Sequence, residues 1–308
     1  MSNARFYEKP EEFSASADSN VNALLRDGYS VVKNAVSGKL IDEFLMRWER
    51  FKIETIAPHA DKLVDGEDMI NGKYRRMVNM HLVLPELERL FVNNRALQVT
   101  DHLFGEPTTL YTSLYFEIGS AQDFHRDTPY FWTNPGYTYF GVWLALEDTD
   151  ESNGALTAIK GSHLHPDTFS FRAEIGQLDL DENGNPKAHS GVLWSNYQKR
   201  VQEACRDAGL TPSELHVKKG DVIIWHPQLM HGGAGIIDPR RTRNSFVMHV
   251  TPQYQVVYAQ DKYFDPGAQL PSLDESIKYR KTSNGRMVRD EPFWAIAQKV
   301  LLSSNASY

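Results

Sequence analysis

The sequence predicts a mainly β protein, an antiparallel sandwich or barrel with flanking helices, and three features lead to this prediction. Short segments rich in aromatic and β-branched residues recur between residues 110 and 251. Turn pairs such as Asn153-Gly154 and Lys219-Gly220 separate these segments. The helical spacing of apolar residues is found mainly before and after them. Many short strands between Gly and Asn turns favour antiparallel sheets over a parallel βαβ sheet.

Helices are predicted where apolar residues recur every three or four positions. The first covers 20–27 and ends at Gly28, and the second begins after Ser37, whose hydroxyl is expected to cap it. The apolar face of the second helix is formed by Leu40, Ile41, Phe44, Leu45 and Trp48. Further helices are predicted at 85–104, at 196–208 and, as a closing element, at 290–302.

Strands are predicted where β-branched and aromatic residues gather or alternate with polar ones. The first covers 29–33, between the first two helices. The remaining strands are predicted at 110–118, 138–146, 155–159, 217–218, 221–225 and 245–251.

No internal repeat, low-complexity tract or Pro/Gly/Ser linker divides the chain. We therefore expect a single domain over 21–308 behind a polar N-terminal arm at 1–20. The long segment 165–216 is polar and mixed in character and interrupts the strands. An insertion of that length in a compact domain is usually functional or disordered, and we expect this one to form part of the entrance to a binding site.

Composition excludes several classes of protein. The 308 residues carry 33 Lys and Arg against 40 Asp and Glu, a formal net charge of −7, without a basic run. Nucleic acid and membrane surfaces are therefore not expected partners. The single cysteine, Cys205, excludes an intrachain disulfide and favours a reducing compartment. Because the N-terminus lacks an apolar signal segment, and no run of about 18 apolar residues follows, we expect a cytoplasmic protein.

A His-x-Asp pair, His125 and Asp127, is the first candidate for chemistry. In an extended segment, residues i and i+2 share a face, so an imidazole and a carboxylate can be presented to one point. His231, which ends a predicted buried strand and precedes two glycines, could add a second imidazole. Two nitrogens and one oxygen on one side of a metal is the arrangement of non-heme Fe(II) oxygenases. For the His-x-Asp pair alone, an ordinary exposed loop is the alternative.

An arginine cluster, Arg240, Arg241 and Arg243, follows His231 and leads into the last predicted strand. An arginine at the start of a strand can hold a carboxylate by two parallel charge-assisted hydrogen bonds. Ser245 lies two residues after Arg243 and shares its face. A solvated turn is the alternative, and we expect it to be correct for two of the three arginines.

Several motifs follow one another in a distinctive order. They are His125-x-Asp127, Trp143-Leu-Ala-Leu-Glu-Asp-Thr, Asn153-Gly154-Ala155-Leu156, Lys160-Gly-Ser-His163, Gly220-Asp221, His231-Gly and an arginine about a dozen residues later. This order resembles the phytanoyl-CoA dioxygenase family of Fe(II)- and 2-oxoglutarate-dependent oxygenases. The segment from Arg26 to Lys33 is similar to the opening of that family, so the resemblance spans about residues 20–255.

The resemblance implies a fold, a metal site and cosubstrates. The fold is a double-stranded β-helix of the jelly-roll, cupin-like type, with N-terminal helices and a long insertion. The implied iron ligands are His125, Asp127 and His231, and the cosubstrates are 2-oxoglutarate and O₂.

Further residues take roles by the same resemblance. Arg243 and Ser245 are expected to hold the far carboxylate of 2-oxoglutarate, and Thr112 and Trp143 to contact this cosubstrate. The expected substrate contacts are Tyr115, Tyr130 and Trp132. From the residues alone, the aromatic run 130–132 is as well explained by packing beneath the insertion as by lining a pocket.

Two positions depart from the family pattern. The family's arginine usually stands eleven residues after the distal histidine, where this chain has Thr242. Arg243, one residue later, heads an Arg-x-Ser pair and is preferred to Arg241. Lys160 replaces the usual proline before Gly-Ser-His, in a turn that we expect to support the fold alone.

Other histidines are weaker candidates for a metal site. His163 and His165 form a His-x-His pair that could bind Zn²⁺, although the resemblance makes this segment a structural turn. His226 lies five residues before His231, so in a straight strand it would face the other way. His249, in an apolar strand, is expected to be a hydrogen-bonded core residue.

The implied reaction is hydroxylation of an unactivated C–H bond in a small-molecule substrate, with release of succinate and CO₂. Desaturation, cyclisation and epimerisation use the same oxidant and stay open. Asp127 disfavours a halogenase, because such relatives carry a small residue in place of the carboxylate. The alternative class is a non-catalytic metal-binding jelly-roll sensor, and a Zn²⁺ hydrolase lacks an evident general base. The substrate, its tethering to coenzyme A or a carrier, and homo-oligomer formation are left open.

Overall fold

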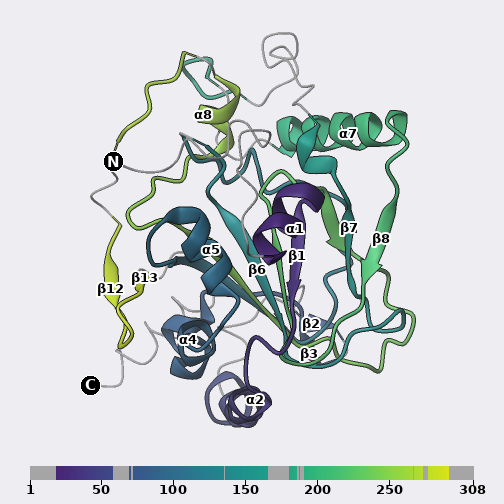
Figure 1. Ribbon diagram of the computed structural model, residues 1–308, viewed down its shortest axis with the longest axis vertical. Coiled ribbons are helices and arrows are strands. Elements are labelled where there is room, and N and C mark those ends of the chain that lie inside the picture. Colours follow the sequence, from purple (N-terminus) through teal and green to yellow (C-terminus); the bar gives the residue numbers. More distant parts are fainter. Residues whose placement is uncertain are drawn as a thin grey trace.

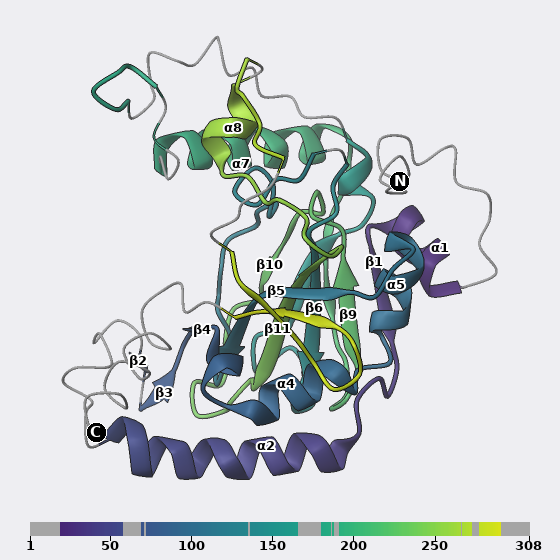
Figure 2. The same ribbon diagram turned by 90° about the vertical axis from the view of Figure 1, so that its left-hand side faces the viewer.

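The computed structural model describes residues 19–57, 69–70, 72–134, 136–165, 180–185, 187, 191–265, 267–272 and 277–290. Two β-sheets form the centre of the molecule, and α7 and α8 lie at the end opposite α2 (Figures 1 and 2). The helices are α1 (Ser19–Asp27), α2 (Gly38–Phe51), α4 (Pro85–Val92), α5 (Leu97–Phe104), α7 (Gly191–Asp207) and α8 (Gln260–Phe264). A short π-helix, η3 (Lys52–Ile56), continues α2, and two 3₁₀ helices are η6 (Met80–Leu82) and η7 (Ser162–Leu164).

The major sheet has eight strands, in the order β1-β9-β6-β11-β5-β13-β12, with β4 also paired to β5. Its strands are β1 (Tyr29–Val32), β4 (Met77–Val78), β5 (Thr109–Phe116), β6 (Phe140–Ala145), β9 (Val222–Trp225), β11 (Ser245–Thr251), β12 (Tyr279–Lys281) and β13 (Met287–Arg289). The minor sheet, in the order β10-β7-β8, contains β7 (Leu156–Ile159), β8 (Pro212–Leu215) and β10 (His231–Gly233). A separate hairpin joins β2 (Met69–Ile70) to β3 (Lys73–Tyr74).

The central strands of the major sheet are buried on both faces. On β6, β9 and β11, Val142, Ile224 and Met248 pack against the N-terminal helices. Their neighbours face the minor sheet, where Trp143, Ile223 and Val247 form a second core. This alternation is the two-residue period of a strand between two apolar layers. Two facing, mainly antiparallel sheets with helices against one of them confirm the predicted jelly-roll architecture.

The predicted helix at 85–104 is wrong in one respect, because the chain breaks between α4 and α5. The Asn94 side chain accepts a hydrogen bond from the Ala96 N–H at 3.0 Å, and the Arg95 N–H donates to the Ala35 carbonyl at 3.0 Å. These contacts replace the helical hydrogen bonds. Ser37 does occupy the N-cap of α2, but its side chain makes no capping hydrogen bond.

The insertion also differs from the prediction. No strand forms at 217–218; the polar segment Pro212–Leu215 forms β8 instead, at the edge of the minor sheet. Segment 165–216 therefore contains one strand of the core fold, and α7 begins at Gly191, ahead of the predicted start. The C-terminal helix predicted at 290–302 and most of the arm at 1–20 lie outside the described residues.

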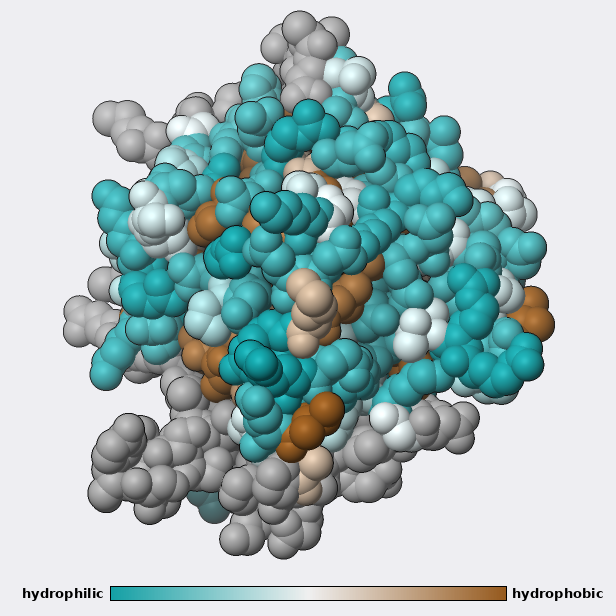
Figure 3. Space-filling view, turned by 90° about the horizontal axis from the view of Figure 1, so that it is seen from below, coloured by the Kyte–Doolittle hydropathy of each residue, from teal (hydrophilic) through white to brown (hydrophobic). Residues whose placement is uncertain are grey.

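No helix among the described residues is long and apolar enough to cross a membrane. Seen from below, the surface is mainly hydrophilic, with apolar side chains in scattered spots (Figure 3).

Candidate metal centre and its cavity

His125 and His231 lie opposite each other across a two-residue backbone pairing. The His125 N–H donates to the His231 carbonyl at 2.9 Å, and the His231 N–H donates back to the His125 carbonyl at 3.0 Å. A Cβ on Gly232 would lie 2.7 Å from the Gln122 carbonyl, and one on Gly233 would lie 2.8 Å from Ser120 Oγ. The two glycines therefore let the loop before His125 lie directly on β10. Contrary to the prediction, His231 begins a strand of the minor sheet rather than ending one.

Both imidazoles are oriented by their own backbone. His125 Nδ1 lies 2.8 Å from the Asp123 carbonyl, and His231 Nδ1 lies 3.0 Å from the Leu229 carbonyl. Because a carbonyl only accepts, each Nδ1 carries the proton and each Nε2 is left as a lone-pair donor. Ligand atoms of His125, Asp127 and His231 all lie within 4.8 Å of one another.

The carboxylate of Asp127 is oriented by Trp225. The indole Nε1–H donates to Asp127 Oδ2 at 2.8 Å, and Oδ1 faces His231 Nε2 at 3.9 Å. The Trp225 ring also packs on His231, with centroids 4.6 Å apart. Gly141 on the neighbouring strand makes room for this indole, since a Cβ there would overlap it.

The charges at this centre suit a cation. Burial is the main reason that the pKa of His125 lies at about 4, and His231 lowers it further. Burial alone would raise the pKa of Asp127, but the three histidines around it and the Trp225 hydrogen bond hold that pKa below its usual value. The site thus offers two imidazoles and one carboxylate. This donor set on one side of an ion fits a divalent transition metal and leaves positions for other ligands.

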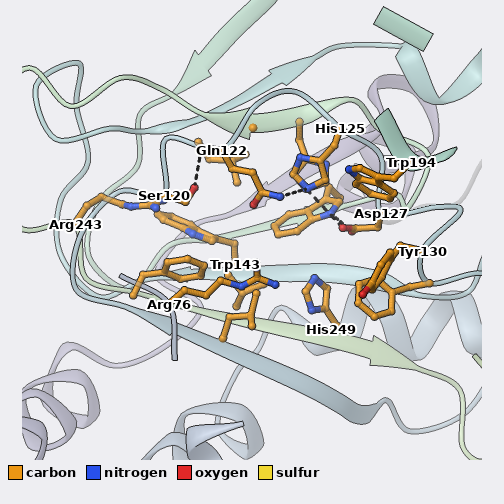
Figure 4. A pocket seen from close by; sticks show the side chains of 18 of the residues that line it. Arg76, Ser120, Gln122, His125, Asp127, Tyr130, Trp143, Trp194, Arg243 and His249 are labelled. Atoms are coloured by element: carbon orange, nitrogen blue, oxygen red, sulfur yellow. Dashed lines mark hydrogen bonds and ion pairs between the residues drawn. The ribbon is translucent and has the colours of Figure 1, made fainter. Parts of the chain in front are cut away.

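A cavity of about 380 Å³ opens beside the three ligands. Figure 4 shows His125 and Asp127 toward one end, with Tyr130 and Trp194, and Arg243 at the other end. The ends are bridged by apolar residues of both sheets, among them Trp143, Leu156 and Val247.

Arg243 is 3% exposed, and its guanidinium has neither an ion pair nor a hydrogen bond to the described residues. It stacks over Trp143 at 5.5 Å and over Phe116 at 5.7 Å. Burial lowers the pKa of Arg243 to about 10, although Glu147 opposes this. Ser245 Oγ is also buried, with no hydrogen-bond partner among the described residues.

The other predicted contacts are divided between the cavity and elsewhere. Trp143 and Tyr130 line the cavity, while Thr112 is hydrogen-bonded to Asn79 at 2.7 Å behind it. Tyr115 lies in the helix-covered core against Phe44 and Trp48. Trp132 packs on two further tyrosines, Tyr258 and Tyr263, and is absent from the cavity wall.

The histidines that were weaker candidates have distinct environments. His163 Nε2 donates to the Leu25 carbonyl at 2.8 Å, and its ring packs on His226, 5.3 Å away. Neither histidine lines the cavity. The expectation for His249 is wrong: its ring lines the cavity, and its Nδ1 has no hydrogen-bond partner in the described part of the chain. The β-strand parity of His249, two residues after Val247, places it on the cavity face.

Sequence reasoning did not identify Trp225, Trp194, Gln122 or Arg76 as site residues. Each lines the cavity, and Gln122 Nε2 lies 3.3 Å from His125 Nε2. Trp225 ends the strand that leads toward His231, and its position in that strand could have indicated that it faces the site. The other three residues lie in loops or on α7, where residue spacing does not indicate a position.

A model of the phytanoyl-CoA dioxygenase family matches residues 24–242. The peroxisomal phytanoyl-CoA dioxygenase of Mus musculus is 23% identical over 253 residues, which cover 73% of this chain and 67% of that protein. A probable alpha-ketoglutarate-dependent hypophosphite dioxygenase of Stutzerimonas stutzeri is 22% identical over 219 residues, covering 68% and 69% of the two chains.

Two solved structures share the fold. EctD from S. alaskensis, with 2-oxoglutarate and 5-hydroxyectoine, has a TM-score of 0.58 at 17% identity, covering 85% of this chain and 89% of that one. The epimerase SnoN, in complex with Fe3+, alpha ketoglutarate and nogalamycin RO, has a TM-score of 0.54 at 17% identity, covering 88% and 97%.

Proposed function

Because the chain belongs to the phytanoyl-CoA dioxygenase family, we propose that it is an Fe(II)- and 2-oxoglutarate-dependent dioxygenase acting on a small molecule. The observation that carries the proposal is the convergence of two imidazoles and one carboxylate at one end of a cavity. The other end holds a buried arginine that has no ion pair with the described residues. The proposed reaction is hydroxylation of a C–H bond, with release of succinate and CO₂.

His125, Asp127 and His231 would hold the iron. Iron in this setting supplies the activation of O₂ that couples decarboxylation of 2-oxoglutarate to oxidation of the substrate. The chain itself orients the donors: two backbone carbonyls hold the imidazoles, and the Trp225 N–H holds the carboxylate. This support reduces the reorganisation that metal binding requires.

Arg243 would bind the far carboxylate of 2-oxoglutarate. Its guanidinium is buried and has no ion pair with the described residues, so a carboxylate between it and the metal would complete its hydrogen bonds. The hydroxyl of Ser245, which has no partner among the described residues, and the ring of Trp143 are proposed further contacts of 2-oxoglutarate. Thr112, which is hydrogen-bonded to Asn79, lies behind these residues.

Hydroxylation is proposed over epimerisation and cyclisation as the default outcome of this oxidant. Proteins of similar fold include an epimerase and a carbocyclase, so the mass of the product is needed to distinguish these reactions. A hydroxylated product is about 16 Da heavier than its substrate, whereas an epimer has the same mass. A cytoplasmic location remains a prediction, since relatives in sequence include peroxisomal proteins.

The decisive experiment is anaerobic addition of Fe(II) and 2-oxoglutarate, followed by O₂. A weak visible charge-transfer band should form, and succinate should appear once O₂ is admitted. A band without succinate in the presence of candidate substrates would favour a non-catalytic binding protein. Failure to form the band would contradict the proposed function.

The ligand set can be tested by substitution. His125→Ala, Asp127→Ala and His231→Ala should each lose bound iron and succinate formation, because each removes one of three protein donors. His249→Ala is the matched control: it lies in the same cavity, outside the ligand group, and should keep its iron. Metal analysis, with thermal unfolding to check the fold, measures both. Full iron occupancy in the three triad variants would refute the assignment.

A further inference from the structure

The cavity contains a second arginine that the proposed reaction does not use. Arg76, in the connection between β3 and β4, lines the cavity but is exposed, unlike Arg243. It has no hydrogen bond or ion pair to any described residue. Figure 4 shows its side chain running beneath Trp143 toward His249.

Arg76 acts on the metal side of the cavity. Burial is the main reason that the pKa of His125 and that of His249 each lie at about 4, and the Arg76 charge lowers both further. The same charge opposes the rise that burial gives to the pKa of Tyr130. In Figure 4 the Arg76 side chain is directed toward His249, on the side of the cavity that holds His125 and Tyr130 rather than at the Arg243 end.

With Fe(II) and 2-oxoglutarate bound, the positive charge of Arg76 would have no balancing negative charge in the cavity. Fe(II) and Arg243 together carry three positive charges, and Asp127 and the two carboxylates of 2-oxoglutarate carry three negative ones. Asp127 is the only carboxylate among the described residues that line the cavity. A cation that lines a cleft without a counter-charge among the described residues favours an anionic ligand there.

Two aromatic side chains, Tyr130 and Trp194, line the cavity on the metal side. Trp194 of α7 packs edge-on against Tyr130, with centroids 5.6 Å apart, and lies 6.1 Å from the His125 ring. Both rings are half-buried and line the cavity, so they present apolar faces next to the metal ligands. Planar or aliphatic groups pack favourably on such faces.

Resting on the proposed function, we propose that Arg76 binds an oxyanion of the primary substrate, a carboxylate or a phosphate, while the apolar body of the substrate packs on Tyr130 and Trp194. The substrate class is thus an amphipathic organic acid. Its anionic group would position the reacting carbon beside the iron, on the side of the ligands away from Arg243.

The test uses matched probes and anaerobic protein loaded with Fe(II) and 2-oxoglutarate. One pair is 3-phenylpropionate and 3-phenylpropanamide; the other is phenethyl phosphate and phenethyl alcohol. Calorimetric titration should show at least one anion binding about tenfold or more tightly than its neutral partner, and the preferred arm identifies the carboxylate or phosphate class. Equal affinities in both pairs, or no binding, would overturn the proposal.

Variants assign the preference to Arg76. Arg76→Gln should reduce it to about twofold or less, and Arg76→Lys should retain part of it. Arg75→Gln is the matched control and should keep the preference. Arg75 is an exposed neighbour that donates to the Ser120 carbonyl at 3.2 Å and does not itself line the cavity. A preference that survives Arg76→Gln would contradict the proposal.

Two readouts separate this proposal from others. The concentration of 2-oxoglutarate that half-saturates substrate-free succinate formation should change less than about twofold in Arg76→Gln. A rise of about tenfold or more would assign Arg76 to the cosubstrate instead. Formation of the visible band before any probe is added tests the proposed function independently, so its failure is distinguishable from failure of the anion site.

Discussion

Arg241 and Arg243 are separated by one residue, and the fold places them in different environments. Arg241 donates to both oxygens of Asp150 at 2.8 Å, away from the cavity. Arg243 is buried in the cavity wall without an ion pair to the described residues. Burying an uncompensated guanidinium is costly, so this position is explained best by a ligand that brings a negative charge.

Arg243→Ala should raise the apparent 2-oxoglutarate constant by about 30-fold or more, because loss of a buried charge pair typically costs about 2–5 kcal/mol. Iron binding should persist, and lysine at this position should restore part of the affinity. Arg241→Ala should change the constant little. Succinate formation against 2-oxoglutarate concentration measures all three. A large defect at Arg241 with near-normal Arg243→Ala would reverse the assignment.

Trp225 contacts two of the three proposed metal ligands. Its indole N–H holds Asp127 Oδ2 at 2.8 Å, which turns Oδ1 toward the imidazoles, and its ring packs on His231. An outer hydrogen bond of this kind fixes the orientation of a ligand and typically changes metal affinity by about 10- to 100-fold. Trp225 is thus a positioning residue.

Trp225→Phe should weaken iron binding by about tenfold, because phenylalanine keeps an aromatic ring but has no N–H. Trp48→Phe is the matched control: its indole also donates to a buried carboxylate, Glu117, at 2.8 Å, but in the other core. Both variants should lose stability, and only Trp225→Phe should lose metal affinity. Competition for iron against a chelator measures the affinity. An affinity of Trp225→Phe equal to that of the unsubstituted protein would show that the hydrogen bond does not orient Asp127.

At the scale of elements, helix α7 of the insertion is hydrogen-bonded to the segment that carries two of the proposed ligands. Gln198 accepts from the Arg126 N–H at 2.8 Å and donates to the Arg126 carbonyl at 3.0 Å. Gln202 donates to the Phe124 carbonyl at 2.7 Å. Arg126 itself is turned away from the cavity, toward α7 and the Ser162 carbonyl. The insertion therefore supports the backbone between His125 and Asp127, while Trp194 lines the cavity.

Gln198→Ala should destabilise the protein by about 1–3 kcal/mol, because two buried backbone groups of Arg126 lose their partner. It should also weaken iron binding, since the segment between two ligands is no longer held. Lys199→Ala, an exposed neighbour on α7, is the control and should change neither quantity. Chemical unfolding and iron titration provide the measurements; unchanged iron affinity despite lower stability would limit α7 to a structural role.

At the scale of the whole molecule, several histidines are buried without charge. Burial lowers the pKa of His81 to about 4. Burial also lowers the pKa of His226 well below its usual value. The unfolded chain, with an ordinary histidine pKa, binds more protons below about pH 6.5 than the folded chain does.

The free energy of unfolding should therefore fall as pH decreases from about 6.5 to 4, by up to about 3 kcal/mol for His81 alone. Above pH 6.5 this contribution is constant, because His81 is neutral in both states. His81→Gln should flatten the dependence, and His216→Gln, at an exposed position, should not. Urea unfolding at several pH values measures the slope. An unchanged slope in His81→Gln would contradict the role of burial.

Local patterns determined a large part of this protein. Aromatic and β-branched content predicted β5, β6, β9 and β11, and helical spacing predicted α1 and α2, because both signals depend on neighbours within a few residues. The residue types of the ordered motifs indicated the family, and the i, i+2 spacing placed His125 and Asp127 on one face. Their partner His231 was indicated by its motif, although its strand and sheet were not.

The tertiary structure alone decided which side chains meet. Trp225 reaches Asp127 across 98 positions of sequence, and Arg95 leaves the helical path for the Ala35 carbonyl. The polar segment of β8 is a strand because β7 offers it an edge, and Arg76 and Trp194 reach the cavity from loops and the insertion. Such contacts depend on the free energy of the packed chain as a whole, which a window of neighbouring residues does not contain.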